Sequence, residues 1–518
     1  MEGLGERCHN RGMDEPSIVE LQKGMSAGEL TARGIALMYL ARVEELDRRG
    51  PRLNAVIELN PDALSIADML DNERRLKGPR GPLHGIPVML KDNIDTAGRM
   101  QTTAGSLALE GHIAAQDAFS VQRLREAGVV ILGKTNLSEW ANFRSSHSTS
   151  GWSSRGGQTR NPYALDRNPC GSSSGSAVAV AAGLCAAAIG TETDGSIICP
   201  AQTCGVVGIK PTVGLVSRSG IIPIAHSQDT AGPLARTVTD AAILLGALTG
   251  VDTHDPLTLT SRGRSHADYT PFLDADGLRG ARVGVARGLF GDDDRVCRVM
   301  DGAIAAMRQA GAEVVDPVEV KRSKELGEAE YTVLLYEFKA DLNDYLAGLG
   351  SDERVHSLKD VITFNETHRD KVMPFFGQET MLAAEAKADL TSQEYQRALE
   401  TCRRLARAEG IDATLNEHQL DVLVAPSGRP ASLTDLVNGD PEHGGPSSPA
   451  AVAGYPAITV PAGFIFGLPV GISFIGTAFA ELVLIKLAYA FEQLTRVRRP
   501  PQFLPTVDLP APPMPPEE

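Results

Sequence analysis

The stretch Cys170-Gly171-Ser172-Ser173-Ser174-Gly175-Ser176 is the densest cluster of small and hydroxyl residues in the chain, and it runs directly into an alanine- and valine-rich segment. Taken alone, this pattern predicts a turn that caps a buried helix, which we expect over residues 176–188. A second cluster, Gly190-Thr191-Glu192-Thr193-Asp194-Gly195-Ser196, follows and also ends in a serine beside a glycine. These two clusters are the first candidates for the chemistry of the protein.

A short buried strand is predicted upstream of both clusters, over residues 85–90, Gly-Ile-Pro-Val-Met-Leu, with Lys91 at its end. A helix over 119–127 and a strand over 129–132 come next, so strands and helices alternate toward the serine clusters. The same alternation returns later, with strands expected at 282–286, 421–425, 457–460 and 470–475 and a helix at 481–494. This pattern is typical of an α/β fold.

The beginning of the chain is predicted to be helical. Ser17 with Glu20 fits a capping box, in which a serine and a glutamate three residues later satisfy each other's backbone N–H groups. Ser26 with Glu29 fits the same pattern ahead of a second helix.

We expect a single domain over residues 15–500. Residues 250–420 are more charged and mostly helical, which is typical of a variable cap over a site. Residues 1–14 are predicted to be a flexible segment. Residues 501–518 form a proline-rich tail that we expect to be extended.

Composition excludes several classes of protein. With 518 residues, of which 42% are hydrophobic, the chain can bury a large core and is neither disordered nor fibrous. Its 50 basic and 65 acidic residues leave a formal charge of −15, which argues against a nucleic-acid partner. No segment reaches the roughly 18 apolar residues that a bilayer span needs, and the N-terminus lacks an apolar signal region. We therefore expect a cytoplasmic protein without a membrane partner.

The cysteines predict reduced, mostly buried thiols. The cysteines are odd in number and widely spread along the chain. The sequence has no CxxC pair and no Cys/His cluster with zinc-ligand spacing, so we predict no metal site. They are Cys8, Cys170, Cys185, Cys199, Cys204, Cys297 and Cys402.

One motif offers an alternative nucleophile. Residues 171–175 match the pattern GxSxG, which would place Ser173 on a nucleophile elbow. That elbow requires a strand running straight into the turn, whereas residues 161–169 are polar and broken by prolines. It also requires a late histidine, and His443 is the only candidate, so we do not favour this interpretation.

Four motifs taken together resemble the amidase signature family, and the resemblance covers nearly the whole chain, most weakly over 250–420. They are the run Gly85–Ile94 that contains Lys91, the serine-glycine cluster at 170–176, Thr193-Asp194-Gly195-Ser196, and the pair Gly208-Ile209-Lys210-Pro211-Thr212 and Asp229-Thr230-Ala231-Gly232-Pro233. Within the family, residues 133–236 look most like the bacterial peptide amidases, which remove ammonia from C-terminal peptide amides. Ser174 and Asp194 depart from the commoner glycines of the family, and both changes also occur in the peptide-amidase-like branch.

This resemblance implies an amidase-signature fold, a mixed central β-sheet covered by helices on both faces, and a Ser-cisSer-Lys triad. By that likeness Ser196 is the nucleophile, Ser172 the bridging serine held by a cis peptide bond, and Lys91 the terminal base. A lysine acts as a base only when neutral, and burial at the end of an apolar strand would favour the neutral amine. A hydroxyl both donates and accepts, so Ser172 can pass a proton from Ser196 to Lys91.

The backbone N–H groups around Ser196 are expected to form the oxyanion hole. Successive N–H groups of Thr193, Asp194, Gly195 and Ser196 could make a concave nest for the developing negative charge. A carboxylate that faced the oxyanion would defeat the hole, so we expect Asp194 to turn away and bond local backbone.

The substrate is predicted less sharply than the reaction. The leading hypothesis is deamidation of C-terminal peptide amides, and the alternatives are a broad (aryl) acylamidase, esterase or carbamate hydrolase and an amidotransferase subunit of a tRNA-dependent transamidation complex. No metal or organic cofactor is expected, the partner is a small-molecule or peptide amide, and the chain is predicted to be a monomer or homodimer. Further candidates for the site and its substrate wall are Gly171, Ser173, Asn142, Ser150, Gly151 and Trp152.

Overall fold

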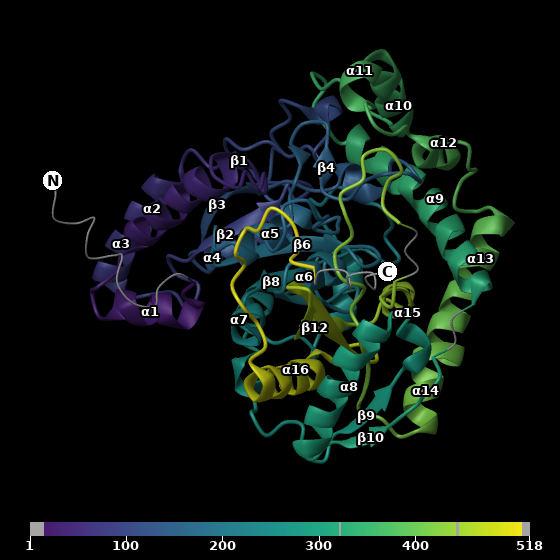
Figure 1. Ribbon diagram of the computed structural model, residues 1–518. Coiled ribbons are helices and arrows are strands. Elements are labelled where there is room, and N and C mark those ends of the chain that lie inside the picture. Colours follow the sequence, from purple (N-terminus) through teal and green to yellow (C-terminus); the bar gives the residue numbers. More distant parts are fainter. Residues whose placement is uncertain (1–14, 321–322, 442–444, 510–518) are drawn as a thin grey trace, which may run out of the picture.

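The computed structural model describes residues 15–320, 323–441 and 445–509 of the chain (Figure 1). The predicted flexible segment 1–14, His443 and the last residues of the proline-rich tail lie outside these ranges. No helix in the described ranges combines the length and the apolar character that a membrane crossing requires.

A mixed sheet of eleven strands forms the centre of the described structure, in the order β1-β3-β2-β6-β8-β7-β12-β13-β11-β9-β10. A small hairpin of β4 and β5 lies apart from it. The strands are β1 Val56–Leu59, β2 Pro87–Lys91, β3 Val130–Thr135, β4 Trp152–Ser153, β5 Gly157–Gln158, β6 Ala187–Glu192, β7 Val207–Lys210, β8 Thr230–Ala235, β9 Arg282–Val285, β10 Glu313–Val315, β11 Val422–Pro426, β12 Ala457–Ile465 and β13 Leu468–Ile475.

The strands that matter most for the site are β2 and β6, which are neighbours and run parallel, with Leu90 opposite Ile189. Their residues are buried along their whole length, as expected for parallel strands covered on both faces. Because parallel strands end at the same edge of a sheet, this register places Lys91, the last residue of β2, beside the end of β6 and the turn that follows.

Helices surround this sheet (Figure 1). Helix α16 packs against α7 and α8, and all three lie on the sheet, while α5 and α6 form a second contacting pair. The helices are α1 Ile18–Ser26, α2 Ala32–Arg42, α3 Ala63–Lys77, α4 Phe119–Glu126, α5 Ser174–Ala181, α6 Ile198–Thr203, α7 Val238–Leu248, α8 Asp294–Gln309, α9 Lys324–Ala347, α10 Leu358–Thr367, α11 Arg369–Val372, α12 Glu379–Glu385, α13 Gln393–Arg403, α14 Asp412–Glu417, α15 Ser448–Ala453 and α16 Glu481–Thr495. The α/β fold with a mixed central sheet is therefore confirmed.

Several local predictions hold. Ser17 caps α1, and its Oγ and backbone N–H exchange hydrogen bonds with Glu20. The strand that ends at Lys91 and the helix at 481–494 are also present, the latter as α16.

Two local predictions are wrong. The helix expected over 176–188 ends at Ala181, because Gly183 takes a left-handed φ of 65° and the chain re-enters the sheet as β6 at Ala187. The second capping box is absent, since Thr31 caps α2 by accepting a hydrogen bond from the N–H of Gly34.

The segment 250–420 divides into two parts. Strands β9 and β10 extend the central sheet, and α8 packs on its strands β12 and β13, so this part belongs to the core. Helices α9–α13 form the helical part of the segment, and α9 contacts α10, α12 and α13 (Figure 1).

Candidate active site

A buried amine and hydroxyl meet where β2 and β6 end. The Lys91 Nζ donates hydrogen bonds to Ser172 Oγ at 2.7 Å and to Thr191 Oγ1 at 2.8 Å, and it also lies 3.2 Å from the Thr191 carbonyl oxygen. Lys91 and Ser172 are both fully buried. The sequence-predicted base and bridging serine are thus in direct contact.

Burial makes Lys91 a base near neutral pH. Removal from water disfavours the ammonium and lowers the pKa of Lys91 to about 7, although the nearby carboxyl groups of Asp229 and Glu192 oppose this shift. A large fraction of the Lys91 side chains is therefore neutral at pH 7.

The turn before α5 presents Ser172 to this lysine. The Gly171–Ser172 peptide bond is cis, and the Ser172 carbonyl accepts a hydrogen bond from the Ser138 N–H at 3.1 Å. A Cβ on Gly171 would lie 2.3 Å from Ser138 Oγ, so only glycine allows this close approach.

Ser173 holds the two serine clusters together. Its Oγ donates to the Thr191 carbonyl at 3.0 Å and accepts from the Thr191 N–H at 3.2 Å. No strand leads into the turn, because residues 161–173 contain none. These bonds make Ser173 a structural link and agree with setting aside the nucleophile elbow.

Ser196 lies in the turn between β6 and α6. Its carbonyl oxygen accepts a hydrogen bond from the Ser173 N–H at 3.1 Å, which fixes its backbone against the first serine cluster. Gly195 takes a φ of 75°, and Glu192 Oε2 accepts from the N–H groups of Ile197 and Ile198 at the start of α6. Both serines are described, and no hydrogen bond joins Ser172 Oγ to Ser196 Oγ.

The Asp194 carboxylate points away from this turn, but not toward local backbone as expected. It accepts hydrogen bonds from Ser447 Oγ at 2.7 Å and Ser448 Oγ at 2.6 Å, at the beginning of α15. Burial and the neighbouring Asp194 carboxylate raise the pKa of Glu330 on α9 well above its usual range. Asp194 therefore connects the turn to α15 and lies beside the Glu330 carboxyl group of α9.

Thr193 is fixed from the other side of the turn. Its Oγ1 donates to Asp229 Oδ1 at 2.5 Å, and Gln228 Nε2 lies 3.4 Å from its carbonyl oxygen. Asp229 also accepts from the N–H groups of Ile224 and Ala225, while burial raises its pKa to about 6. These contacts immobilise the segment from which we expect the oxyanion donors.

The remaining substrate-wall candidates lie in the loop before the first serine cluster. Asn142 Oδ1 accepts from Ser148 Oγ, the Ser150 N–H donates to Asp440, and the Gly151 N–H donates to Ser138 Oγ. Trp152 is buried and packs edge-on against Phe375 and Phe376, so it is a packing residue. Ser138 thus joins this loop to the carbonyl of Ser172.

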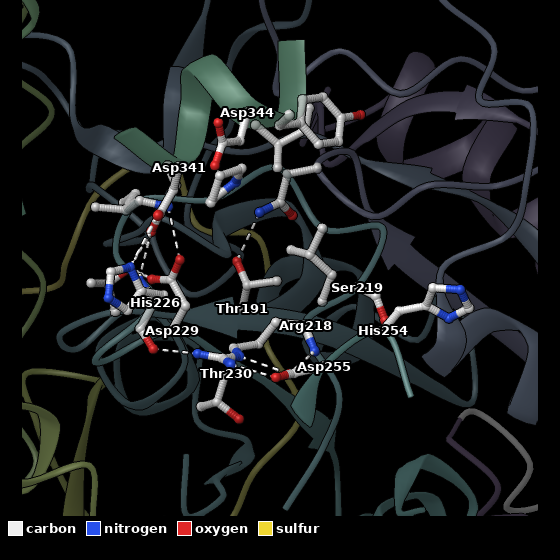
Figure 2. A pocket seen from close by; sticks show the side chains of 18 residues that line it. Thr191, Arg218, Ser219, His226, Asp229, Thr230, His254, Asp255, Asp341 and Asp344 are labelled. Carbon is white, nitrogen blue, oxygen red and sulfur yellow. Dashed lines mark hydrogen bonds and ion pairs between the residues drawn. The ribbon is translucent and has the colours of Figure 1, made fainter. Parts of the chain in front are cut away.

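A pocket of about 440 Å³ adjoins the site through Thr191 and Thr193, which are among its lining residues (Figure 2). Lys91, Ser172 and Ser196 do not line it. Asn93 Nδ2 donates to Thr191 Oγ1 at its wall, at 3.0 Å. Beside this pocket, both ring nitrogens of His226 face carboxylates, Asp341 at 2.9 Å and Glu337 at 3.4 Å.

Those three residues are also the one group of possible metal ligands that comes together in the described ranges. Because each ring nitrogen of His226 already pairs with a carboxylate, and Asp341 raises the pKa of His226, the group is satisfied as an ionic network.

Some residues at the site were not predicted from the sequence. Thr191 is the second partner of the Lys91 amine, and Asn93 follows Lys91 by two residues. Asn93 stands in the run Gly85–Ile94 and Thr191 in the second serine cluster, 190–196, so their nearness in sequence to Lys91 and Ser196 was the available signal. Ser138, Ser447 and Ser448 carry no comparable signal, since their partners are distant in the sequence.

The prediction of reduced thiols is wrong for two cysteines. Cys170, directly before Gly171, forms a disulfide with Cys199, three residues after Ser196. The spacing of these cysteines matches no pairing motif, and the fold alone brings them together. Cys185, Cys204, Cys297 and Cys402 are free, and Cys8 lies outside the described ranges.

Removing this disulfide is expected to lower the free energy of unfolding by about 3–4 kcal/mol, because the bond closes a loop between cysteines 29 residues apart. Urea unfolding of the Cys170→Ser/Cys199→Ser variant and of the reduced protein tests this. Cys297→Ser, which removes a free cysteine, is the control. Reduction should lower the free energy of unfolding of this variant as much as it does that of the unaltered protein. Equal stability of the oxidised and reduced protein would contradict the prediction.

The fold and the buried lysine-serine contact are those of a hydrolase of the amidase type. A family model described as Amidase matches residues 35–485. The chain belongs to the amidase signature family and is an amidase, an enzyme that hydrolyses amide C–N bonds.

Three similar proteins show the range of this family. The native peptide amidase from Stenotrophomonas maltophilia is 55% identical in sequence and superimposes with a TM-score of 0.89 over 94% of this chain and 99% of that one. A probable amidase of Arabidopsis thaliana is 43% identical over 95% of this chain and 92% of its own. A glutamyl-tRNA(Gln) amidotransferase subunit of Carboxydothermus hydrogenoformans is 36% identical over 93% of this chain and 98% of its own.

Proposed function

We propose that this amidase removes ammonia from C-terminal peptide amides through an acyl-enzyme on Ser196, with Ser172 as proton relay and Lys91 as base. The observation that carries the proposal is the buried hydrogen bond of 2.7 Å between Lys91 Nζ and Ser172 Oγ. The Ser173 N–H donates to the Ser196 carbonyl, which joins the turn that bears Ser196 to the Ser172–Ser173 turn and supports a common site for the three side chains.

Acylation begins when Ser196 Oγ attacks the amide carbonyl carbon. Its proton passes to Ser172 Oγ as the Ser172 proton passes to the neutral Lys91 amine. The tetrahedral oxyanion is stabilised by backbone N–H groups among Thr193, Asp194, Gly195 and Ser196. The Asp194 carboxylate does not compete for these N–H groups, because both of its oxygens accept hydrogen bonds from Ser447 and Ser448.

The leaving amine then takes a proton back along the same relay and departs as ammonia. Water attacks the acyl carbon while Lys91 again accepts a proton through Ser172. The bond between that carbon and Ser196 Oγ then breaks, Ser196 Oγ takes the proton back along the relay, and the peptide acid is released. Apart from this water, each step uses side chains and backbone groups of this chain.

The choice of peptide amides rests on the 55% identity to the Stenotrophomonas peptide amidase. A release assay separates the substrate classes: peptide amides should yield ammonia with a higher kcat/KM than anilides, esters or carbamates. Faster release of arylamine from anilides would favour an acylamidase instead. Turnover by the purified chain alone separates this proposal from a transamidation subunit, which would need its complex.

Replacing Ser172 with alanine is expected to lower kcat by about 10²–10⁴-fold, because the proton path from Ser196 to Lys91 is interrupted. Steady-state kinetics on a peptide amide test this, and KM should change little. Ser176→Ala is the matched control, since Ser176 is an equally buried serine of α5 that bonds Thr135 and the Ile189 carbonyl. Equal activity losses in the two variants would contradict a relay role for Ser172.

Two further expectations stay predictions. Gel filtration of the purified chain tests whether it is a monomer or homodimer. The cytoplasmic location also stays a prediction, and the Cys170–Cys199 disulfide argues against it, because cytoplasmic thiols are kept reduced.

A further inference from the structure

A second cavity, of about 530 Å³, lies where α9, α13 and α15 meet the loop segments around residues 212–228 and 257–264. Its walls come from α9, α13, the end of α15 and the segments that contain Arg264 and Phe479. Neither Lys91 nor the two predicted catalytic serines line it. Its volume falls within the range of sites for small organic ligands.

The charge of this cavity differs from that of the whole chain. Four arginines are among its lining residues, and none of its lining residues is an aspartate or glutamate, although acidic residues outnumber basic ones by 65 to 50. Arg218 is neutralised by Asp255, with a contact of 2.5 Å. In the described ranges Arg264, Arg403 and Arg407 form no ion pair. The cavity wall therefore presents three arginines without a carboxylate partner, while Glu337 and Asp341 pair with His226, another lining residue.

Aromatic rings hold two of these arginines in place. The Arg407 guanidinium lies 5.7 Å from the centre of the Tyr455 ring, and its Nε donates to the Ala453 carbonyl at 2.8 Å. The Arg264 guanidinium lies 4.9 Å from the centre of the Phe479 ring. Both rings also line the cavity. Stacking of this kind orders a guanidinium while its outer N–H donors stay available.

Apolar side chains complete the walls, among them Val333, Leu399 and Val452. A ligand that fits this surface combines an anionic group, which the guanidinium forks bind through paired hydrogen bonds, with an apolar body. We propose that this cavity is an accessory binding site for a small organic anion, a phosphate monoester or a carboxylate. It does not include Lys91, Ser172 or Ser196, and it shares Arg218 and His226 with the pocket beside Thr191.

Calorimetric titration with phenyl phosphate and with benzoate tests the site. At least one of the two anions should bind saturably, and the Kd of that anion should rise when the ionic strength is raised. The anion with the lower Kd shows whether the site prefers a phosphate monoester or a carboxylate. Benzyl alcohol, the neutral probe, should not bind with comparable affinity. Absence of saturable binding by both anions, or equal binding of benzyl alcohol, would overturn the proposal.

Arg403→Gln and Arg264→Gln should each raise the Kd of the bound anion at least fivefold, and both side chains are exposed, so the variants should fold. Arg404→Gln is the matched control, because Arg404 is the next residue, does not line the cavity and pairs with Glu325 and Glu409. Ser196→Ala should bind the anion as the unaltered chain does. Equal losses in Arg403→Gln and Arg404→Gln, or a loss in Ser196→Ala, would place the anion elsewhere.

Discussion

Replacing Lys91 with methionine is expected to lower kcat for amide hydrolysis by about 10⁴-fold while the protein still folds. The Lys91 amine is the only group bonded to Ser172 Oγ in the described ranges, so its loss removes the acceptor of the relayed proton. Methionine fills a similar volume. In addition, an unfolded lysine is protonated at pH 7, whereas the buried amine has a pKa near 7, so burial of Lys91 costs free energy that methionine does not. We therefore expect no loss of thermal stability.

The same pKa predicts the pH dependence of the unaltered enzyme. Since only the neutral amine accepts a proton, kcat/KM should rise with pH through an apparent pKa near 7 and level off above it. A pH–rate profile on a neutral peptide amide measures this directly. A profile that falls with rising pH over that range would mean that the charged form of Lys91 is required.

Two further variants separate the chemistry of Lys91 from the effect of burying a lysine. Lys134 is also fully buried and lies opposite Leu90 on the neighbouring strand, but it bonds Ile94 and Thr102. Lys134→Met should therefore keep activity within about tenfold. Lys91→Ala leaves a space in which added methylamine can act as the base, so its activity should rise with methylamine concentration. Equal losses in both methionine variants would argue against a base at Lys91.

The sequence predicted the site best at Lys91, where the pattern of a buried strand and the chemistry of a lysine without water meet in one segment. An apolar run of six residues is enough to predict a buried strand, and a lysine directly after it must lose much of its hydration. Parallel pairing with β6 then accounts for the contact between Lys91 and Thr191. The assignment of Ser172 and Ser196, in contrast, came from resemblance, because serine beside glycine is equally common in ordinary turns.

What the sequence could not predict depends on contacts between distant segments. Asp194 was expected to bond nearby backbone, yet its partners are Ser447 and Ser448, more than 250 residues away. The Cys170–Cys199 disulfide is similar, because only the packing of the two serine-bearing turns brings the cysteines together. The early end of α5 has another cause: alanine favours a helix, and the single left-handed glycine at 183 is enough to end it.

Replacing Ser196 with alanine is expected to lower kcat by about 10⁵–10⁶-fold, because no acyl-enzyme can then form. Phenylmethylsulfonyl fluoride should label the unaltered enzyme on the peptide that contains Ser196, and mass spectrometry should find no label on Ser196→Ala.

Ser173→Ala is the decisive control. Ser173 is the other candidate nucleophile, but its Oγ donates a hydrogen bond to the Thr191 carbonyl and accepts one from the Thr191 N–H. Its alanine variant should lose stability and still become labelled on Ser196. Labelling that disappears in Ser173→Ala and persists in Ser196→Ala would instead make Ser173 the nucleophile, and the roles of Ser172 and Lys91 would have to be reassigned around it.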